Sequence, residues 1–334
     1  MKTFVVVTSI SPPNAALRLI AEGCREHGQE FIVVGDSKSP AEFQLDGADF
    51  YSVDRQREIG SSYARLCLPN SYARKNIGYL LAMKHGADVI VETDDDNFPH
   101  EGFWEPRGLI QHAPVLLDSG WVNLYRYYRT NGVWPRGFPL DAIYRDAPEL
   151  GTKLYTAACP IQQGLADENP DVDAIWRLLH PEPILFFNTD RKLILGRESW
   201  CPFNSQNTSW FPQAFPLMYL PAYCSIRMTD IWRSFVAQRI CWENGWGVLF
   251  HGPTVHQERN EHDLMKDFEL EIPGYLHNRE IARRLEALRL QSGIDYLGEN
   301  LHRCYEELIC MGLVGAEESG LLSAWLGDLK AIRC

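Results

Sequence analysis

The first hundred residues alternate between β-rich runs and segments with a helical spacing of apolar residues, and this alternation constrains the fold more than any other feature. The β-rich runs cover residues 3–9, 30–35, 48–53 and 88–92, and the helical segments cover residues 14–27 and 70–85. Alternating strands and helices predict an α/β fold in which a mostly parallel sheet carries helices on both faces.

Polar residues stand at the carboxyl ends of three of these predicted strands. Thr8 and Ser9 end the first strand, Asp36 follows the second, and the acidic run 94–96 follows the fourth. Ligands bind beyond the carboxyl ends of the strands in such sheets, so we expect these side chains to converge on one site.

The rest of the chain is organised differently. Residues 98–225 are rich in Pro, Gly, Trp and Phe, and we expect long loops, short strands and a pocket wall inserted into the core fold. Beyond them we expect a helix at 229–244, a strand at 247–250 and amphipathic helices at 279–292, 297–311 and 317–332. The expected division is an α/β domain over residues 1–275 and a C-terminal helical extension over residues 276–334. The last helix can pack on the core, on a second subunit or on a membrane surface.

Three adjacent aspartates, Asp94, Asp95 and Asp96, come almost directly after the predicted strand 88–92. Adjacent carboxylates raise each other's pKa unless a cation lies among them. Asp94 and Asp96 can approach one ion, and hard oxygen ligands favour Mg²⁺ or Mn²⁺ over zinc. Such an ion keeps room for the phosphates of a nucleotide diphosphate. A solvated acidic turn or a helix N-cap is the alternative.

Arg74 and Lys75 lie in the first turn of the helix predicted over residues 70–85. Cations at this end oppose the helix dipole, so an anion should compensate them. Either a bound diphosphate or a salt bridge to a neighbouring acid would do so, and both interpretations stay open.

Two residues near predicted element ends are candidates for chemistry. Asp230 stands at the start of the helix predicted over residues 229–244, where an acid can be a simple cap or a general base. His256 stands in a loop with Gly and Pro after the strand at 247–250, where an imidazole can bind a metal or transfer protons.

Two aromatic segments also carry polar groups suited to a ligand. Arg136, within Trp-Pro-Arg-Gly-Phe-Pro, can hold a phosphate or carboxylate, unless the segment is only a rigid turn. Residues 203–208 combine amide and hydroxyl groups that suit sugar hydroxyls, unless they form a polar surface loop.

Composition and absent motifs argue against several classes of protein. The net charge of −12 disfavours a nucleic-acid-binding surface. No apolar run approaches the ~18 residues of a membrane-spanning helix, and the first residues do not resemble a signal peptide. The nine cysteines are scattered without a Cys-x-x-Cys pair, which favours reduced thiols in a cytosolic protein. The sequence also lacks the glycine-rich fingerprint of dinucleotide oxidoreductases, the P-loop and the Gly-x-Ser-x-Gly elbow of hydrolases.

Several of these motifs, in this order, resemble the glycosyltransferase-like domain of the plant STELLO proteins and their bacterial and invertebrate relatives. The resemblance covers roughly residues 3–270 and rests on the stretches VVVTSISPPN, IVVGDSKSP, LPNSYARKNIGYLLAMKHGADVIVETDDDN, QQGLADENPDVDAIWRL, FNSQNTSWF and MTDIWRSFVAQRICWENGWGVLFHGPTVHQERNEHD. More distantly, the chain is similar to the reversibly glycosylated polypeptide family, which includes UDP-arabinopyranose mutases. Both groups are associated with the GT-A fold, a Rossmann-like nucleotide-binding sheet with an Asp-x-Asp metal site.

The resemblance implies which residues bind the nucleotide. Thr8, Ser9 and Asp36 lie where this fold holds the base and ribose. Arg74 and Lys75 lie where it approaches the nucleotide or its diphosphate.

The resemblance also implies a metal site and a base. Asp94 and Asp96 match the metal-binding pair, and we group Asp95 with the nucleotide-binding residues. Asp230 falls where inverting enzymes of this fold place the catalytic base, and His256 where some members supply a late metal or phosphate contact.

The expected function is therefore a metal-dependent, inverting glycosyltransferase that uses Mn²⁺ or Mg²⁺ and a nucleotide sugar of the UDP class. The expected acceptor is a glycan or lipid-linked glycan, and Arg136 is grouped with the donor-binding residues. A UDP-sugar mutase that interconverts pyranose and furanose forms, or a non-catalytic scaffold, is the alternative. We expect a cytoplasmic protein that can make peripheral contact with the inner face of a membrane. We expect no nucleic-acid partner, and self-association stays open.

Overall fold

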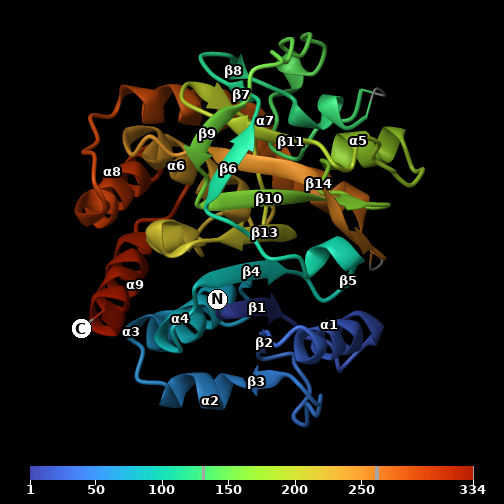
Figure 1. The fold of residues 1–334 in the computed structure, drawn as a ribbon. Coiled ribbons are helices and arrows are strands. Elements are labelled where there is room, and N and C mark those ends of the chain that lie inside the picture. Colours follow the sequence, from blue (N-terminus) through green and yellow to red (C-terminus); the bar gives the residue numbers. More distant parts are fainter. Residues whose placement is uncertain (130–131, 260–262, 334) are drawn as a thin grey trace.

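The computed structural model describes residues 1–129, 132–259 and 263–333. Across these ranges the main element is a ten-stranded sheet of order β3-β2-β1-β4-β13-β10-β14-β11-β7, with β5 paired to β14. Figure 1 shows the strands stacked from β3 at the bottom to β7 near the top. The strands of this sheet are β1 Thr3–Thr8, β2 Glu30–Val34, β3 Asp49–Tyr51, β4 Val89–Thr93, β5 Asn97–Pro99, β7 Val115–Leu116, β10 Ile161–Asp167, β11 Lys192–Leu195, β13 Asn207–Trp210 and β14 Val248–Gln257.

Two small sheets and a set of helices complete the architecture. The pair β6 and β9 is antiparallel, and the pair β8 and β12 is parallel. These four strands are β6 Ile110–Ala113, β8 Gly120–Trp121, β9 Tyr155–Ala158 and β12 Ser199–Trp200. The α-helices are α1 Ala15–Glu26, α2 Val53–Glu58, α3 Ser62–Leu66, α4 Lys75–Lys84, α5 Ala174–Leu179, α6 Thr229–Glu243, α7 Leu264–Ala287, α8 Leu297–Cys310 and α9 Glu318–Arg333.

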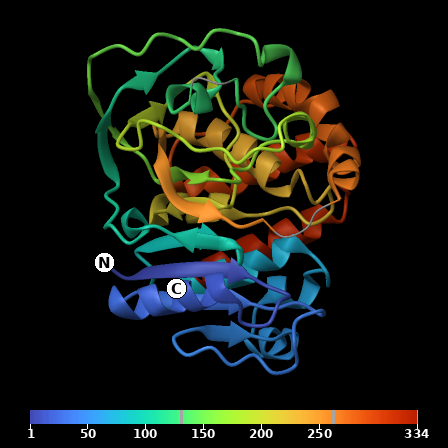
Figure 2. The same ribbon diagram turned by 90° about the vertical axis from the view of Figure 1, so that its right-hand side faces the viewer.

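The main sheet is mixed. Strands β3, β2, β1 and β4 are parallel to one another, as expected from the alternation in the first hundred residues. Antiparallel pairs then join β4 to β13 and β13 to β10, and β10 lies parallel to β14. The expected α/β class is confirmed, with the parallel part confined mainly to the N-terminal half that Figure 2 shows in blue and cyan.

Helices cover both faces of the N-terminal strands because the side chains of a strand alternate between its faces. Val5 and Val7 of β1 belong to the apolar cluster that contains Leu17 of α1. Val6 of the same strand belongs to the cluster that contains Ile77 of α4. The apolar run of β1 is therefore buried on both faces.

The middle of the chain contributes more to the sheet than expected. It supplies β10 and β13 to the centre of the sheet, where we expected an insertion of loops and short strands. The sequence of β10 does not look like a buried strand because it contains Gln162, Gln163 and Gly164. These residues are buried although they are polar or small. Gly164 allows a close approach, because a Cβ there would lie 2.3 Å from the Asn207 amide nitrogen.

The strand expected at 247–250 continues to Gln257. The prediction that His256 lies in a loop with Gly and Pro is therefore wrong. Gly252 and Pro253 usually interrupt strands. Here the register between β10 and β14 shifts between Gly164 and Ala166, which gives the strand a local irregularity beside the proline.

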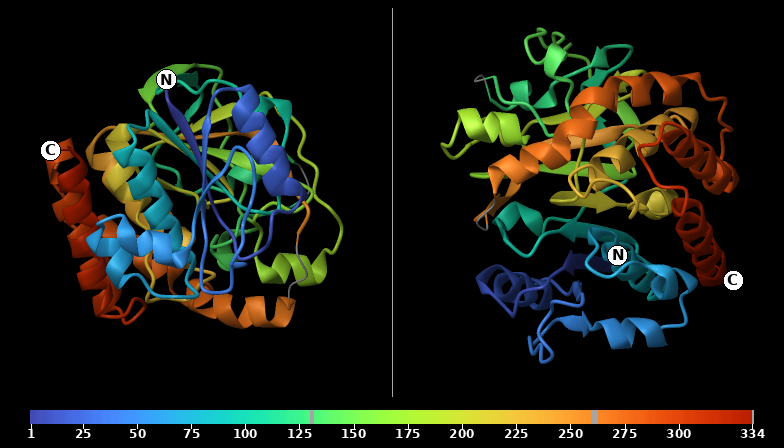
Figure 3. Two further views of the ribbon diagram at one scale, coloured as in Figure 1. Left: turned by 90° about the horizontal axis from the view of Figure 1, so that it is seen from below. Right: turned by 180° about the vertical axis from the view of Figure 1, so that it is seen from behind.

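Helix α7 begins at Leu264, well before the start expected at residue 279. Pro273 and Gly274 resemble helix-ending residues in the sequence, yet both lie inside α7. Gly274 is needed for close packing, because a Cβ there would lie 2.3 Å from Met228 Sδ. The domain boundary expected after residue 275 consequently falls within α7, the long orange helix in the right-hand view of Figure 3.

The C-terminal helices pack on the core of this chain. Leu321, Leu322 and Trp325 of α9 are buried in the main apolar cluster. Asp328 accepts hydrogen bonds from the backbone N–H groups of Ser62 and Tyr63, at 3.0 and 2.9 Å, at the start of α3. Of the three expected docking modes for the last helix, the structure shows packing on the core.

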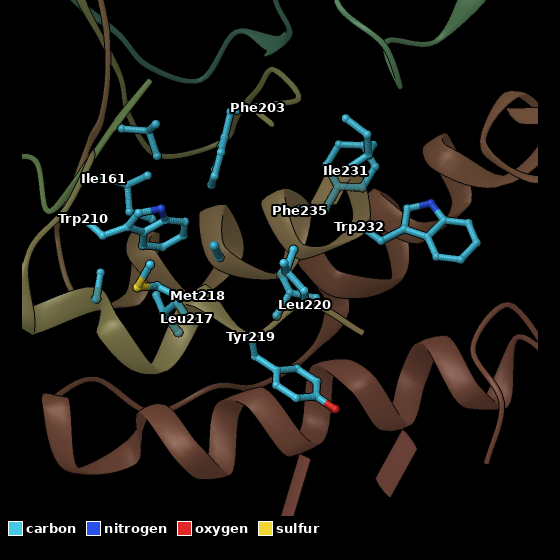
Figure 4. Packing of buried hydrophobic residues seen from close by; sticks show 14 of the residues in the cluster. Ile161, Phe203, Trp210, Leu217, Met218, Tyr219, Leu220, Ile231, Trp232 and Phe235 are labelled. Carbon is cyan, nitrogen blue, oxygen red and sulfur yellow. The ribbon is translucent and has the colours of Figure 1, made fainter. Parts of the chain in front are cut away.

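A large apolar cluster beneath α6 sets the position of the residues at the start of that helix. Figure 4 shows Ile231 and Phe235 of α6 together with Phe203 and Trp210, which come from the chain around β13. All four side chains are buried, so α6 has little freedom to move relative to the sheet.

None of the helices in the described part of the chain is both long and apolar enough to cross a membrane. Each cysteine within the described ranges has a free thiol, and Cys334 lies outside these ranges.

Candidate active site

A pocket of about 710 Å³ opens at the carboxyl ends of the N-terminal strands and extends to the start of α6. Its volume is in the range of small-molecule sites. The expected convergence of strand ends is confirmed, because one pocket is lined by nine of the predicted site residues: Thr8, Ser9, Asp36, Arg74, Asp94, Asp95, Asp96, Arg136 and Asp230. Lys75 and His256 do not line it.

The acidic turn, residues 94–96, is held by hydrogen bonds from both halves of the chain. Ser9 donates to Asp95 Oδ2 at 2.5 Å, and Gln257 donates to Asp96 Oδ1 at 2.9 Å. Burial, followed by the charge of Asp94, raises the pKa of Asp96 to about 7, and burial also raises the pKa of Asp95. The turn therefore concentrates carboxyl groups in an environment that disfavours their negative charge.

Lys75 supplies a positive charge beneath this turn. Its side chain is fully buried, and its Nζ lies 2.8 Å from Asp94 Oδ1 and 2.9 Å from the Tyr72 hydroxyl. The Tyr72 hydroxyl also donates to Asp94 Oδ1 at 2.9 Å. Of the two interpretations left open for this lysine, the structure shows the salt bridge to a neighbouring acid.

Asp36 and Arg74 hold the loop that precedes α4. The carboxylate of Asp36 accepts the backbone N–H groups of Asn70 and Ser71, each at 2.9 Å. Arg74 is buried and donates to the backbone carbonyl of Leu68 at 3.1 Å, and its Nε lies 3.9 Å from Asp36. Both side chains line the pocket while their polar atoms stabilise its wall.

Asp230 lies at the start of α6 and is paired with Arg136. Arg136 Nη2 lies 3.0 Å from each carboxylate oxygen of Asp230. Arg136 also forms a bidentate pair with Asp171, with both contacts at 2.7 Å. Burial alone would raise the pKa of Asp230, but the charges of Arg136 and Arg233 outweigh it and lower that pKa. Asp230 is therefore ionised at neutral pH.

The segment 203–208 is buried, so its interpretation as a polar surface loop is wrong, and its residues Asn204, Ser205 and Gln206 line the pocket. Ser205 donates to Asp230 Oδ2 through its N–H and its hydroxyl, each at 3.2 Å. Its hydroxyl lies 2.6 Å from that of Tyr72. Asp94, Tyr72, Ser205 and Asp230 thus lie in a row of contacts across the pocket, in which the two hydroxyl groups share two hydrogens among three contacts.

His256 is directed away from the acidic turn. Neighbouring side chains of a strand point to opposite faces, and Gln257 is the neighbour that contacts Asp96. The His256 ring instead lies 3.1 Å from a ring nitrogen of His100. Within the residues that the structure describes, no three His, Cys, Asp or Glu side chains are grouped to hold a metal ion. A metal contact by His256 stays a prediction.

Six charged residues of the pocket were not predicted as site residues: Lys38, Asp171, Arg177, Arg227, Arg259 and Asp267. Asp171 and Arg259 follow the carboxyl ends of the parallel strands β10 and β14. The rule that identified Asp36 would have identified these two residues if β10 and the full length of β14 had been recognised.

The proteins that this chain resembles are glycosyltransferases. A family model described as STELLO glycosyltransferases matches residues 227–334. Two proteins of Arabidopsis thaliana, named probable glycosyltransferase STELLO2 and probable glycosyltransferase STELLO1, are 28% and 27% identical to the chain, and each alignment covers 98% of it. The chain spans only 45% and 44% of their lengths. The resemblance seen in the sequence is confirmed: the chain is a distant homologue of the STELLO glycosyltransferase family.

Proposed function

We propose that this chain is a metal-dependent, inverting glycosyltransferase of the GT-A type. It transfers a sugar from a nucleotide sugar, of the UDP class, to a hydroxyl group of a glycan or glycolipid. The observation that carries the proposal is that one pocket joins the strand ends at Thr8 and Ser9, the acidic turn and Asp230. Such a pocket can bind a nucleotide at one end and present its sugar to a base at the other.

The acidic turn has the properties that a divalent cation requires. The charges of Asp94 and Asp95 add to burial in raising the pKa of Asp96, and a nearby cation would offset this repulsion. Mg²⁺ is commonly held by one or two carboxylates together with substrate phosphates, so Asp94 and Asp96 suffice as protein ligands. The cation would supply charge neutralisation for the departing diphosphate.

The chain's own residues would orient the donor and accept the acceptor's proton. In the transfer, the acceptor O–H bond breaks, its proton moves to an oxygen of Asp230, and the acceptor oxygen forms the new bond to the anomeric carbon. The bond from that carbon to the diphosphate breaks, and the diphosphate leaves with the electron pair. Asp230 is available for this role because it is ionised and lines the pocket, and Arg136 and Ser205 fix its orientation. Its lowered pKa makes it a weaker base than a free aspartate.

The metal assignment is tested by calorimetry of UDP binding with Mn²⁺. We expect Asp94→Ala combined with Asp96→Ala to abolish metal-dependent UDP binding. Asp46→Ala combined with Asp54→Ala is the matched control, since both of these side chains are more than four-fifths exposed on the surface. Equal UDP affinity of the first pair and the wild type would overturn the metal assignment.

Incubation of the wild type with a UDP-sugar and Mn²⁺, without acceptor, separates the proposal from the alternatives. Slow release of free UDP supports a transferase that uses water as a poor acceptor. A UDP-sugar isomer as the product would identify a mutase instead, and failure to bind any UDP-sugar would favour a scaffold.

A further inference from the structure

Three arginines line the wall of the pocket that is built from the C-terminal half of the chain. Arg177 belongs to α5, Arg227 lies two residues before α6, and Arg259 follows β14. The acidic turn follows β4 in the N-terminal half of the chain, and Figure 1 shows α5 in the upper part of the molecule, away from β2 and β3. The pocket thus has basic side chains on its C-terminal wall, and this wall meets the acidic turn, because the N–H of Glu258 donates to the Asp96 carbonyl at 3.1 Å.

Two of these arginines already have carboxylate partners. Arg227 Nη2 lies 2.6 Å from Glu271, and Arg259 Nη2 lies 2.7 Å from Asp267. Arg177 differs from them, because it forms no ion pair with another residue of the described ranges. Its guanidinium donates to the Asn169 side-chain oxygen at 3.0 Å and to the Pro170 carbonyl at 2.5 Å. Neutral acceptors therefore hold Arg177 in place, and the nearby carboxylates of Asp171 and Glu271 offset its charge only from a distance.

The surroundings of Arg177 disfavour its positive charge. Burial, followed by the charge of Arg259, lowers its pKa to about 10; Arg227 acts in the same direction, and Asp171 and Glu271 oppose them. The pKa of Arg259 is likewise lowered by burial and by the charge of Arg227. An anion placed among the three guanidinium groups would relieve this repulsion, and their forked donors match the oxygens of a carboxylate or phosphate.

We propose that Arg177, flanked by Arg227 and Arg259, is a subsite for an anionic group, a carboxylate or phosphate, that a substrate of this pocket carries in addition to the nucleotide diphosphate. The inference rests on the proposed function in that it assigns the basic C-terminal wall of the same pocket. The anionic group has two sources: a carboxylate on the transferred sugar, or a phosphate or carboxylate on the acceptor.

The subsite itself is tested with inorganic phosphate on protein kept metal-free by a chelator. Without a metal, the carboxylates of the acidic turn repel phosphate, so the readout does not depend on the nucleotide site. We expect calorimetry to show saturable phosphate binding by the wild type and at least tenfold weaker binding by Arg177→Gln, because the variant loses charge-assisted hydrogen bonds. The matched control is Arg283→Gln, since Arg283 is 68% exposed on α7.

A second variant separates loss of the subsite from loss of the fold. Arg177→Lys keeps the charge but loses the planar fork, so phosphate affinity should lie between those of the wild type and Arg177→Gln. Circular dichroism of both variants should match the wild type. Phosphate binding that is absent from the wild type, or unchanged in both variants, overturns the proposal.

The source of the anionic group follows from two donors measured with Mn²⁺. If Arg177→Gln weakens binding of UDP-glucuronic acid but not of UDP-glucose, the sugar carries the carboxylate. If neither donor is affected while phosphate binding is lost, the group belongs to the acceptor. Failure of the wild type to bind any nucleotide would count against the proposed function alone, because the phosphate measurement decides the subsite independently.

Discussion

Arg136 holds both carboxylate oxygens of Asp230, each 3.0 Å from its Nη2. The same guanidinium is paired with Asp171, so one buried cation serves two acids that line the pocket. From the sequence we expected this arginine to hold an anion of the substrate. In the structure, Arg136 instead pairs with two carboxylates of the protein itself, Asp171 and Asp230. Its charge keeps Asp230 in the ionised form.

This arrangement predicts different effects for the two acids. Asp230→Asn should lower the rate of sugar transfer by about a hundredfold or more, as for removal of a general base, while UDP affinity with Mn²⁺ changes little. Asp171→Asn is the matched variant, because Asp171 contacts the same arginine, and it should reduce the rate far less. Initial rates with a UDP-sugar and its acceptor provide the measurement. Equal losses in the two variants would contradict the assignment of Asp230 as the base.

The contact between Lys75 and Asp94 leads to a second prediction. Lys75→Met removes the buried cation and should lower the free energy of unfolding of the metal-free protein by about 3 kcal/mol, as in other broken buried pairs. Mn²⁺ should stabilise this variant more than the wild type, because the metal no longer competes with the ammonium group for Asp94. Urea unfolding with chelator and with Mn²⁺ measures both effects.

The control for this experiment is Lys266→Met, which removes an exposed lysine of α7. It should change stability by less than about 0.5 kcal/mol in either condition. If Mn²⁺ stabilises Lys75→Met no more than the wild type, the metal does not bind at Asp94.

The sequence was informative where secondary structure is periodic. The alternation in the first hundred residues predicted the parallel strands, and the strand-end rule placed Ser9, Asp36 and the acidic turn in one pocket. That inference needs only the order of the elements, because the carboxyl ends of parallel strands meet at one edge.

The partners of these residues could not be predicted in the same way. Asp171 meets Arg136 across a separation of 35 residues, through loops without periodicity. The buried strand β10 contains polar residues such as Gln163, which hydrogen-bonds to Asn204, so its burial depends on contacts that sequence patterns do not reveal. For the same reason Arg177, which follows β10, was not expected in the pocket.

A third prediction concerns the buried pair of Glu92 and Arg233, which connects β4 to α6. The two side chains are almost fully buried, and their charged groups lie 2.8 Å apart. Arg233→Met should lower the free energy of unfolding by about 3–5 kcal/mol, because it leaves an unbalanced buried carboxylate. Adding Glu92→Gln to this variant should recover part of the loss, since the double variant has no unpaired charge. A double-mutant cycle by chemical denaturation provides the test, and additive losses would contradict it.

The last prediction is a pH dependence that originates at His251. Burial is the main cause that lowers the pKa of this histidine from 6.5 to about 3, and its Nδ1 lies 2.8 Å from the carbonyl of Gly252. Between those pH values the unfolded chain binds a proton at this position and the folded chain does not. The stability that His251 contributes is therefore complete above pH 6.5 and is lost as the pH falls toward 3, by up to about 1.4 kcal/mol per pH unit.

Substitution should isolate this contribution. His251→Gln keeps a polar side chain but cannot take up a proton, so its free energy of unfolding should fall less steeply between pH 6.5 and 4 than that of the wild type. His85→Gln, which removes an exposed histidine, is the control for the substitution itself. Urea unfolding at several pH values measures the slopes. Parallel slopes for the wild type and His251→Gln would show that this histidine is protonated in the folded protein as readily as in the unfolded chain.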